Sequence, residues 1–297
     1  MSAAAQPAVA APAPAAAGVR RHSRWRGHDL RLVVGCIGLV AFVLAAALAG
    51  VLAPYAPDIL DLAARLHGPS SAHLLGTDQL GRDILSRILY GLRPSLEGGL
   101  VAIVLAALAG TIVGVPAGYL GRWFDTLSTR AVDLLVAWPS IFLALAIVLI
   151  AGPGSFQVVI AIGLAELPVF ARVVRSIAAT QAASDHLTAA RTVGASHLRI
   201  MRLHILPFVI APVVVQLAIS APQAIVAEAS LNYLGLGTQP PAASLGSMVS
   251  EGQDFLSLSS SQVVYPIAAI VVLVICLTLI ADGLQDRLDP HRQKVRA

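Results

Sequence analysis

Lysine is almost missing from this chain of 297 residues, because Lys294 is the only one. The phosphate-binding loop of P-loop ATPases needs a lysine between a glycine and a serine or threonine, and here Val295 follows Lys294. The sequence also has no His-Glu-x-x-His zinc pattern and no Gly-x-Ser-x-Gly nucleophile elbow. We therefore expect a non-catalytic chain that binds no cofactor or metal ion of its own.

Charge and cysteine are also scarce. Charged residues make up 12% of the chain and hydrophobic residues 57%, and the mean hydropathy is +0.80, which excludes an ordinary soluble domain. The two cysteines, Cys36 and Cys276, both fall inside long apolar runs, so a disulfide framework is not expected. The net charge of +4 gives no reason to expect nucleic acid as a partner.

Long apolar runs are what the chain has instead. A helix needs about 20 apolar residues to cross a bilayer, and six runs qualify. The sequence therefore predicts an all-α, polytopic membrane protein with six transmembrane helices, at about 31–54, 96–119, 131–151, 157–177, 205–228 and 262–283.

The basic residues predict the orientation of these spans. Sixteen of the 20 lie before the first span, between spans two and three, around the loop between spans four and five, or after the last span, and four lie between spans one and two. The loop at 229–261 has none. Because basic loops are retained inside, we expect a multi-pass protein with both termini in the cytosol.

The N-terminal segment has two interpretations. Residues 1–18 are rich in alanine and proline, and arginines follow at 20–26 before the first apolar run, an order that imitates a signal peptide. That run is longer than a typical cleaved segment, so a disordered cytosolic tail and a retained first helix are the preferred prediction.

A charged insert at 185–207, DHLTAARTVGASHLRIMRLHILP, separates two apolar spans. Asp185 is expected to cap a short helix, Gly194 to end it in a left-handed conformation, and Ser196 to cap a second one. Pro207 suits the first turn of the next span. Arginines at 191, 199 and 202 favour the cytosolic side, so we interpret the insert as a cytosolic docking element rather than an ordinary loop.

The insert resembles the loop shared by membrane subunits of binding-protein-dependent ABC importers, which runs Glu-Ala-Ala, three residues, Gly, nine residues, Ile, one residue, Leu-Pro. Thr188 stands where glutamate is usual and His204 where isoleucine is usual. In that family the loop is the coupling helix, which docks on the ATPase subunit. The residues that the resemblance assigns to ATPase coupling are Asp185, Thr188, Ala189, Ala190, Arg191, Gly194, Ala195, Ser196 and Pro207.

A second motif lies between spans one and two, where residues 75–87 read LGTDQLGRDILSR. It resembles a signature of C-type permease subunits in the dipeptide, oligopeptide and nickel importer group. Its charge pattern predicts an interfacial helix on the outer side, with Arg82 and Arg87 turned to lipid head groups or paired with Asp78 and Asp83. The residues assigned to this extracytoplasmic signature are Gly76, Thr77, Asp78, Gly81, Arg82 and Asp83.

A third stretch, EASLNYLGLG at 228–237 with the following QPP, matches the same group. Its glycines and prolines predict a turn-rich outer segment without helix. With residues 133–140 and 282–290, the resemblance covers about 75–290.

The resemblance implies a type I ABC importer permease fold in a bacterial inner membrane. Its implied partners are a homologous B-type permease, two ATPases that bind ATP and Mg, an extracytoplasmic binding protein, and membrane lipid. The expected organisation is a tail at 1–30, a first helix with an outer segment at 31–95, a core at 96–284 with a coupling loop at 183–204, and a cytosolic tail at 285–297. The expected cargo is dipeptides or oligopeptides, with nickel or another small solute as the alternative.

Two glutamates and three glycines stand out within the spans. Glu166 either lines the pathway or pairs with a partner subunit, or it sits in a helix break before Pro168 and reaches water. Glu228 is expected at the outer end of span five, at an interface or gate. The four-residue spacing of Gly110, Gly114 and Gly118 predicts a helix face for close packing.

Two other classes of function are weighed against the importer. A stand-alone secondary transporter or channel would use Glu166 as its ion-coupling carboxylate, and would be supported by an internal repeat or paired broken helices. A non-transporting scaffold or sensor is the other class. His67 and His73 are isolated in the outer loop and are expected to be surface residues rather than metal ligands.

Overall fold

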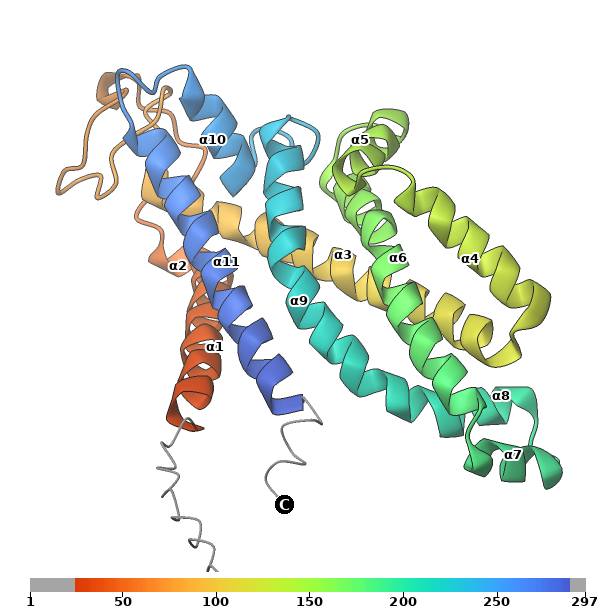
Figure 1. Cartoon of the computed structure of the whole chain (residues 1–297). Helices are drawn as coiled ribbons and strands as arrows, with labels where there is room; N and C mark the ends of the chain where they lie inside the picture. Colours follow the sequence, from red (N-terminus) through yellow and green to blue (C-terminus); the bar gives the residue numbers. More distant parts are fainter. Residues whose placement is uncertain (1–24, 289–297) are drawn as a thin grey trace, which may run out of the picture.

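The computed structural model describes residues 25–288, and within this range it is helical with no β-strand. Figure 1 shows long helices lying side by side, with short helices at both ends of the bundle. The long helices are α1 (Trp25–Ala47), α3 (Ile84–Leu120), α6 (Ser155–Ala182), α9 (Leu206–Tyr233) and α11 (Ser261–Leu288). The expectations for the segments 1–24 and 289–297 lie outside the described residues.

Five described helices are long and apolar enough to cross a membrane, and the number rises to six if one bent pair counts as a single span. The predicted span at 131–151 falls within that pair, so it is bent and not one continuous helix. The pair consists of α4 (Arg122–Val136) and α5 (Ser140–Ala151), which are bent by 88°. The bend lies at Pro139, which has no N–H for the helix ladder and keeps Trp138 out of helical geometry.

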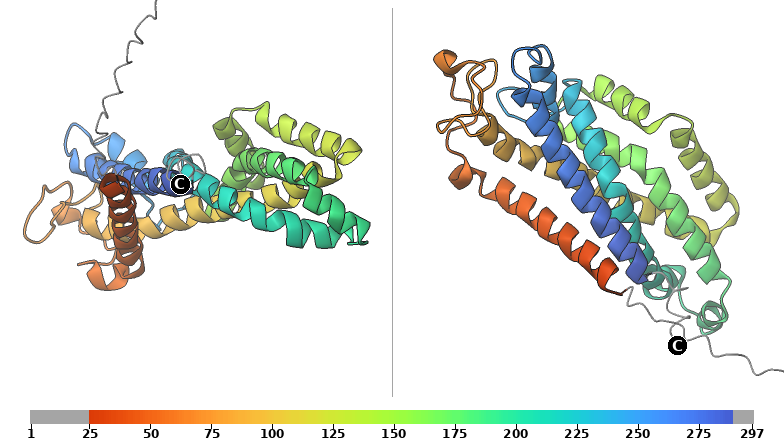
Figure 2. Two further views of the ribbon diagram at one scale, coloured as in Figure 1. Left: turned by 60° about the horizontal axis from the view of Figure 1, so that its bottom comes forward. Right: turned by 60° about the vertical axis from the view of Figure 1, so that its left-hand side comes forward.

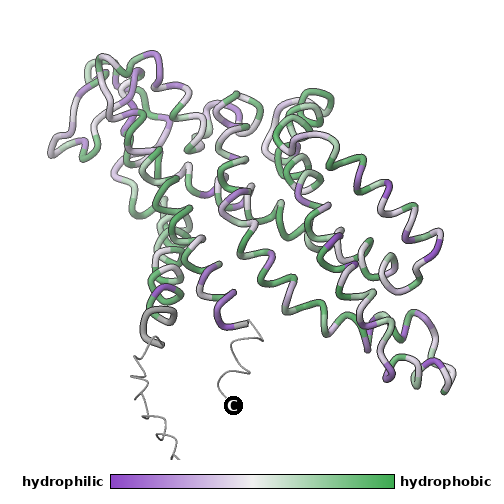
Figure 3. The backbone as a smooth tube through the Cα atoms, in the orientation of Figure 1, coloured by the Kyte–Doolittle hydropathy of each residue, from purple (hydrophilic) through white to green (hydrophobic). Residues whose placement is uncertain are grey.

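Apolar side chains cover the outside of the long helices, as a lipid environment requires. Ile37, Ile112 and Ile150 are 64%, 72% and 90% exposed. Figure 3 shows hydrophobic residues along the long helices, and hydrophilic ones concentrated in the end loops and in the short helices after α6. The hydropathy of the sequence therefore predicts the spans, because the apolar residues that face lipid dominate the mean hydropathy of each segment.

Glycines line the contact between α3 and α6, which is the most extensive helix contact among the described residues. The Cβ atom of a residue at Gly110 would lie 2.6 Å from Phe170 Cβ, one at Gly114 would lie 2.8 Å from the Ala171 carbonyl oxygen, and one at Gly118 would meet the Arg175 carbonyl oxygen. The predicted small-residue face is confirmed, and its partner is the helix that leads into the charged insert.

The first and last long helices, α1 and α11, lie side by side, as both views of Figure 2 show. A Cβ at Gly35 would lie 2.7 Å from the Cys276 carbonyl oxygen. Both cysteines are free, as expected. The start of α1 and the end of α11 point to the same end of the bundle as the charged insert (Figure 1), an arrangement compatible with the expected common side for the termini and the insert.

Several predicted boundaries move. The structure starts α3 at Ile84, so the expected division between 95 and 96 falls inside that helix. Span five continues to Tyr233, and a further helix, α10 (Leu245–Gln253), follows it. The prediction of a turn-rich segment without helix, made for 228–237 and the following QPP, is therefore wrong for 228–233, which belong to α9. The short elements not yet named are α2 (Ala49–Leu52), a 3-10 turn (Leu62–Ala64), α7 (Asp185–Thr192), α8 (His197–Ile200) and a π-helical turn (Met201–Ile205).

Candidate functional site

The charged insert forms two short helices at one end of the bundle (Figure 1). The first, α7, begins after Ser184, whose backbone has the extended conformation of a cap, and Asp185 is its first residue rather than its cap. Gly194 has φ +84° and ends α7 as predicted. Its N–H donates to the Arg191 carbonyl at 2.9 Å, and the Ala195 N–H donates to the Ala190 carbonyl at 3.1 Å. These bonds give α7 a defined end.

The second helix, α8, begins at the predicted cap, because the Ser196 side chain accepts a hydrogen bond from the Arg199 N–H at 3.4 Å. It then runs through the π-helical turn into α9, with Pro207 in the first turn of α9 as expected. The expected loop at 183–204 therefore includes the start of a 37-residue helical run, 197–233. No loop separates α8 from α9.

A buried apolar cluster fastens the insert to the bundle. Leu187, Ile200, Ile205 and Val209 are completely buried. They pack with Val115, Tyr119, Val174 and Ala178 of α3 and α6. The insert is thus part of the same packed body as the spans it joins.

Tyr119, near the end of α3, makes the polar contacts of this junction. Its hydroxyl lies 3.0 Å from Nδ1 of His197, and the Arg191 guanidinium carbon lies 5.0 Å from the centroid of its ring. One buried tyrosine therefore contacts both α7 and α8. This role of Tyr119 is not predictable from the sequence, because no local pattern reveals a contact 78 residues away along the chain.

Replacing Tyr119 with phenylalanine should remove the hydroxyl contact and keep the ring. We expect a loss of about 1 kcal/mol, which is typical of one hydrogen bond, measured as a lower thermal unfolding midpoint of the purified chain. The same loss should appear in His197→Ala, and the double variant should lose little more. Fully additive losses would show that the hydroxyl and the imidazole do not act on each other.

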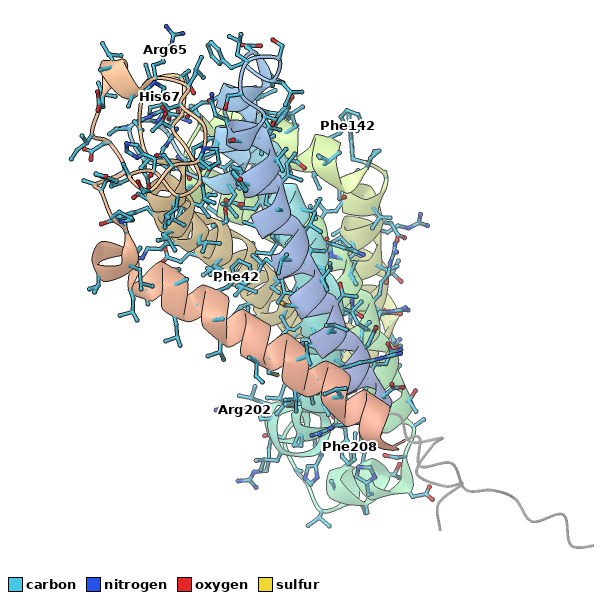
Figure 4. All side chains as sticks on the ribbon, turned by 90° about the vertical axis from the view of Figure 1, so that its left-hand side faces the viewer. Phe42, Arg65, His67, Phe142, Arg202 and Phe208 are labelled. Carbon is cyan, nitrogen blue, oxygen red and sulfur yellow. The ribbon has the colours of Figure 1, made fainter. Side chains whose placement is uncertain are left out.

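The outward surface of the insert mixes arginine with apolar residues. Val193, Leu198 and Leu203 are 89%, 61% and 64% exposed, and arginines at 191, 199 and 202 are exposed beside them. Figure 4 shows Arg202 and Phe208 at this end of the molecule and Arg65 and His67 at the opposite end. Exposed Val, Leu and Arg in one place are typical of a protein interface.

At the opposite end, the predicted outer signature is a turn followed by the start of α3, not an interfacial helix. Gly76 and Gly81 have φ +82° and +75°, which favours glycine. Asp83 caps α3 by accepting from the Ser86 N–H at 2.8 Å, and it also lies 3.0 Å from His73 Nδ1. Asp83 thus accepts hydrogen bonds from the α3 backbone and pairs with His73, and it forms no ion pair with an arginine of the described residues.

Two arginines of this signature are buried in a four-charge cluster, so the expectation that they face lipid head groups is wrong. Arg82 Nε lies 2.6 Å from Asp78 Oδ2, which bears out the alternative pairing, and its NH2 lies 2.6 Å from Glu251 Oε2. Arg87 NH1 lies 2.6 Å from Asp78 Oδ2 and 2.9 Å from Glu251 Oε2. The cluster is neutral in total and ties α10 to the start of α3.

Glu251 was missed by the sequence analysis. Burial alone would raise its pKa, but the hydrogen bonds and charge of Arg87, and then those of Arg82, outweigh burial and hold the pKa below its ordinary value. Glu251 therefore stays ionised at neutral pH. Thr77 supports the same turn by accepting a hydrogen bond from the His67 N–H at 3.0 Å.

The two glutamates of the spans lie in different surroundings. Glu166 lies in α6, which continues through Pro168, so the predicted helix break before that proline does not occur. It is half-buried and lines a cavity of about 430 Å³. Glu228 is 2% exposed and faces Gly98 of α3, and Asn232 Nδ2 donates to it at 2.5 Å. Glu228 thus lies in the last turns of α9, near the predicted outer end of span five, and its side chain is buried within this chain.

No metal site is found among the described residues, where no three His, Cys, Asp or Glu side chains form a group that could hold an ion. His73 is paired with Asp83, and the His67 backbone N–H is bonded to Thr77.

Comparison with known proteins finds one matching family model and several similar permease proteins. A family model described as "Binding-protein-dependent transport system inner membrane component" matches residues 110–294. The chain is 40% identical over 258 residues to the "Dipeptide transport system permease protein DppC" of Alkalihalophilus pseudofirmus, which covers 87% of this chain and 85% of that protein.

Two further relatives are about as similar. The "Di/tripeptide transport system permease protein DppC" of Pseudomonas aeruginosa is 38% identical over 269 residues, covering 89% of each chain. The "Glutathione transport system permease protein GsiD" of Pectobacterium atrosepticum is 38% identical over 269 residues, covering 90% of this chain and 89% of that one.

The fold also has a counterpart among solved structures. A chain from the "Crystal structure of an amino acid ABC transporter with histidines" superimposes with a TM-score of 0.51 at 16% identity, covering 69% of this chain and 94% of that chain. At this identity the likeness shows a shared helical fold.

Proposed function

Since the chain belongs to the family of binding-protein-dependent transport system inner membrane components, we propose that it is the C-type permease subunit of an ATP-driven importer of dipeptides or oligopeptides. It is a multi-pass membrane protein with the helical fold of ABC importer permeases. The peptide cargo comes from the names of the relatives. Family membership favours a permease subunit over a stand-alone secondary transporter, channel or scaffold.

The observation that best supports a coupled subunit is the construction of the insert. Its tip exposes arginine and apolar residues, while its base is buried against α3 and α6 and continues without a break into α9. Such an element moves as a rigid unit, so a force applied at its tip reaches the spans. We propose that α7 and α8 dock on an ATPase subunit, with the residues assigned above to coupling at or beside the contact.

The remaining parts of the complex follow from this role. Two ATPases bind ATP and Mg and hydrolyse ATP, a homologous B-type permease completes the pathway, and a binding protein delivers peptide from the outside. The insert and both termini then lie in the cytosol of a bacterial cell, and the four-charge cluster lies at the outer surface of the inner membrane. ATP binding would favour one orientation of the pathway by population shift.

The proposed function is tested by purification of the tagged chain from its native membrane in mild detergent. We expect a second permease and two ATPases in stoichiometric amounts, and peptide uptake by vesicles that contain this complex, the binding protein and ATP. A solitary oligomer in several mild detergents, without ATPase subunits, would overturn the proposal.

Replacing Gly194 with valine should uncouple ATP hydrolysis from transport. A β-branched residue is strained at φ +84°, although no atom lies within 4 Å of the position a Cβ would take. The end of α7 must then change, and we expect peptide uptake per ATP hydrolysed to fall about tenfold, within the usual range of a coupling free energy. ATPase activity and uptake of the reconstituted complex are the measurements.

Gly152→Val is the matched control, because Gly152 has φ +88° and equally open surroundings but lies in the loop before α6. It should unfold neither the chain nor the complex and should leave the uptake per ATP near the wild-type ratio. Equal ratios in both variants would remove the coupling role from the insert.

A further inference from the structure

The cavity beside Glu166 has the size and lining of a ligand site. Its volume of about 430 Å³ falls in the usual range for small-molecule pockets. It opens between α5, α6 and α9, in the half of the bundle away from α7 and α8 (Figure 1). In the proposed orientation, that half faces the side from which the binding protein delivers cargo.

The lining is apolar with a few polar groups, and only one of them is ionisable. Ile162, Val226 and Leu231 contribute apolar wall, whereas Ser140 and Gln223 are neutral side chains that can hydrogen-bond peptide amides. Glu166 is the single acid, and no basic residue lines the cavity. The cavity therefore has a net negative character at one point of an apolar wall.

Glu166 differs from the other charged residues on its own helix. Arg172 pairs with Asp133 at 3.1 Å, and Arg175 pairs with Asp125. Within residues 25–288 no ion pair is formed by Glu166, and the side chain beside it is the neutral hydroxyl of Ser220. A cation that enters the cavity would strongly stabilise a half-buried carboxylate in an apolar wall, because the carboxylate has no other charged partner there.

We propose that this cavity receives the amino-terminal end of the transported peptide, with the Glu166 carboxylate paired to the peptide α-ammonium group. The inference rests on the proposed function, because it takes peptides as the cargo. It assigns to the permease a contact for the one cation that every unmodified peptide carries, whatever its side chains. The neutral groups of Ser140 and Gln223 then serve the first peptide bond, so the site is tolerant of sequence.

The test compares two probes, Ala-Ala and N-acetyl-Ala-Ala, in vesicles that contain the complete complex. The binding protein is supplied saturated with each probe, and its affinity for each is measured separately, so that its own selectivity is removed. Wild-type complex should import the free dipeptide about tenfold faster, a typical effect of one desolvated charge pair. Glu166→Gln should bring the ratio of the two rates close to one, and Glu166→Asp should keep most of it.

Gln223→Ala is the matched variant, since it alters the same cavity and leaves the carboxylate in place. It should slow both probes and keep their ratio. A Glu166→Gln complex that slows both probes equally would overturn the inference and leave the importer intact. If the Glu166→Gln complex loses the B-type permease, Glu166 contacts that subunit and the inference is overturned. If uptake follows an imposed pH gradient, Glu166 acts in proton coupling and the inference is likewise overturned. If wild-type complex imports neither probe, the proposed function fails, and this inference fails with it.

Discussion

Replacing Arg87 with methionine should cost the fold about 3–5 kcal/mol, the usual result of removing one partner from a buried ion pair. The Arg87 side chain is 2% exposed and bonds both Asp78 and Glu251. Without it, Arg82 alone must neutralise the buried carboxylate of Asp78 and the partly buried carboxylate of Glu251. Methionine fills a similar volume, so the loss reports charge rather than a cavity.

The loss of stability should be greatest near the four-charge cluster, because this cluster joins α10 to the start of α3. We expect faster amide hydrogen exchange in 76–83 and 245–253, together with a lower thermal midpoint. Exchange in α7 and α8, at the other end of the bundle, should stay unchanged. Faster exchange everywhere, without an excess in those two segments, would contradict the assigned role of Arg87.

Two further variants distinguish the effect of the lost charge from the effect of the changed side-chain volume. Arg172→Met removes an arginine whose pair with Asp133 is about half exposed on both sides, at 52% and 53%, so it should cost less than about 1 kcal/mol. In the double variant Arg87→Met with Glu251→Gln, Arg82 and Asp78 remain as a neutral pair. The double variant should therefore be more stable than Arg87→Met alone.

The sequence predicted those elements whose determinants are local. The charged insert was placed correctly because Gly194, Ser196 and Pro207 act on their own backbone, through a positive φ, a cap and a first-turn position. Only its first cap shifts, from Asp185 to Ser184. The long spans were found for the same reason, since hydropathy is a property of each residue.

The predicted helix boundaries are wrong where an apolar run is not one continuous helix, or where a helix continues through a proline. The run at 131–151 is apolar enough to span, yet Pro139 divides it into α4 and α5. The opposite occurs at Pro168, where α6 continues. A proline within a membrane helix is tolerated when neighbouring groups satisfy the freed carbonyl, and a sequence pattern alone does not show whether such groups are present.

The outer cluster illustrates contacts that no local pattern contains. Arg87 and Glu251 are 164 positions apart, and the helix that carries Glu251 begins with a capping box formed by Ser244 and Ser247. Glycines and prolines before it suggested turns only. Charge alternation in 75–87 favoured an exposed helix, because the sequence does not show that Glu251 is a distant partner of both arginines.

Replacing Gly118 with leucine should prevent α3 and α6 from packing and cost at least about 3 kcal/mol, at the upper end for overpacked interiors. A Cβ there would meet the Arg175 carbonyl oxygen and would lie 2.7 Å from Ala178 Cβ and 2.8 Å from the Ala179 nitrogen. Two of these atoms belong to the backbone, so no rotamer change relieves the clash. The amount of folded chain in the membrane and its thermal midpoint are the measurements.

Gly118→Ala should show the same defect in smaller form, since its single methyl group already reaches those backbone atoms. Gly50→Leu is the control, because Gly50 is exposed in α2 and its nearest neighbour to a Cβ is the Tyr90 hydroxyl at 3.7 Å. A stable Gly118→Leu protein would mean that α3 and α6 can separate. The insert, which α3 and α6 both hold, would then not be rigidly joined to the spans, and the coupling mechanism proposed above would lose its physical basis.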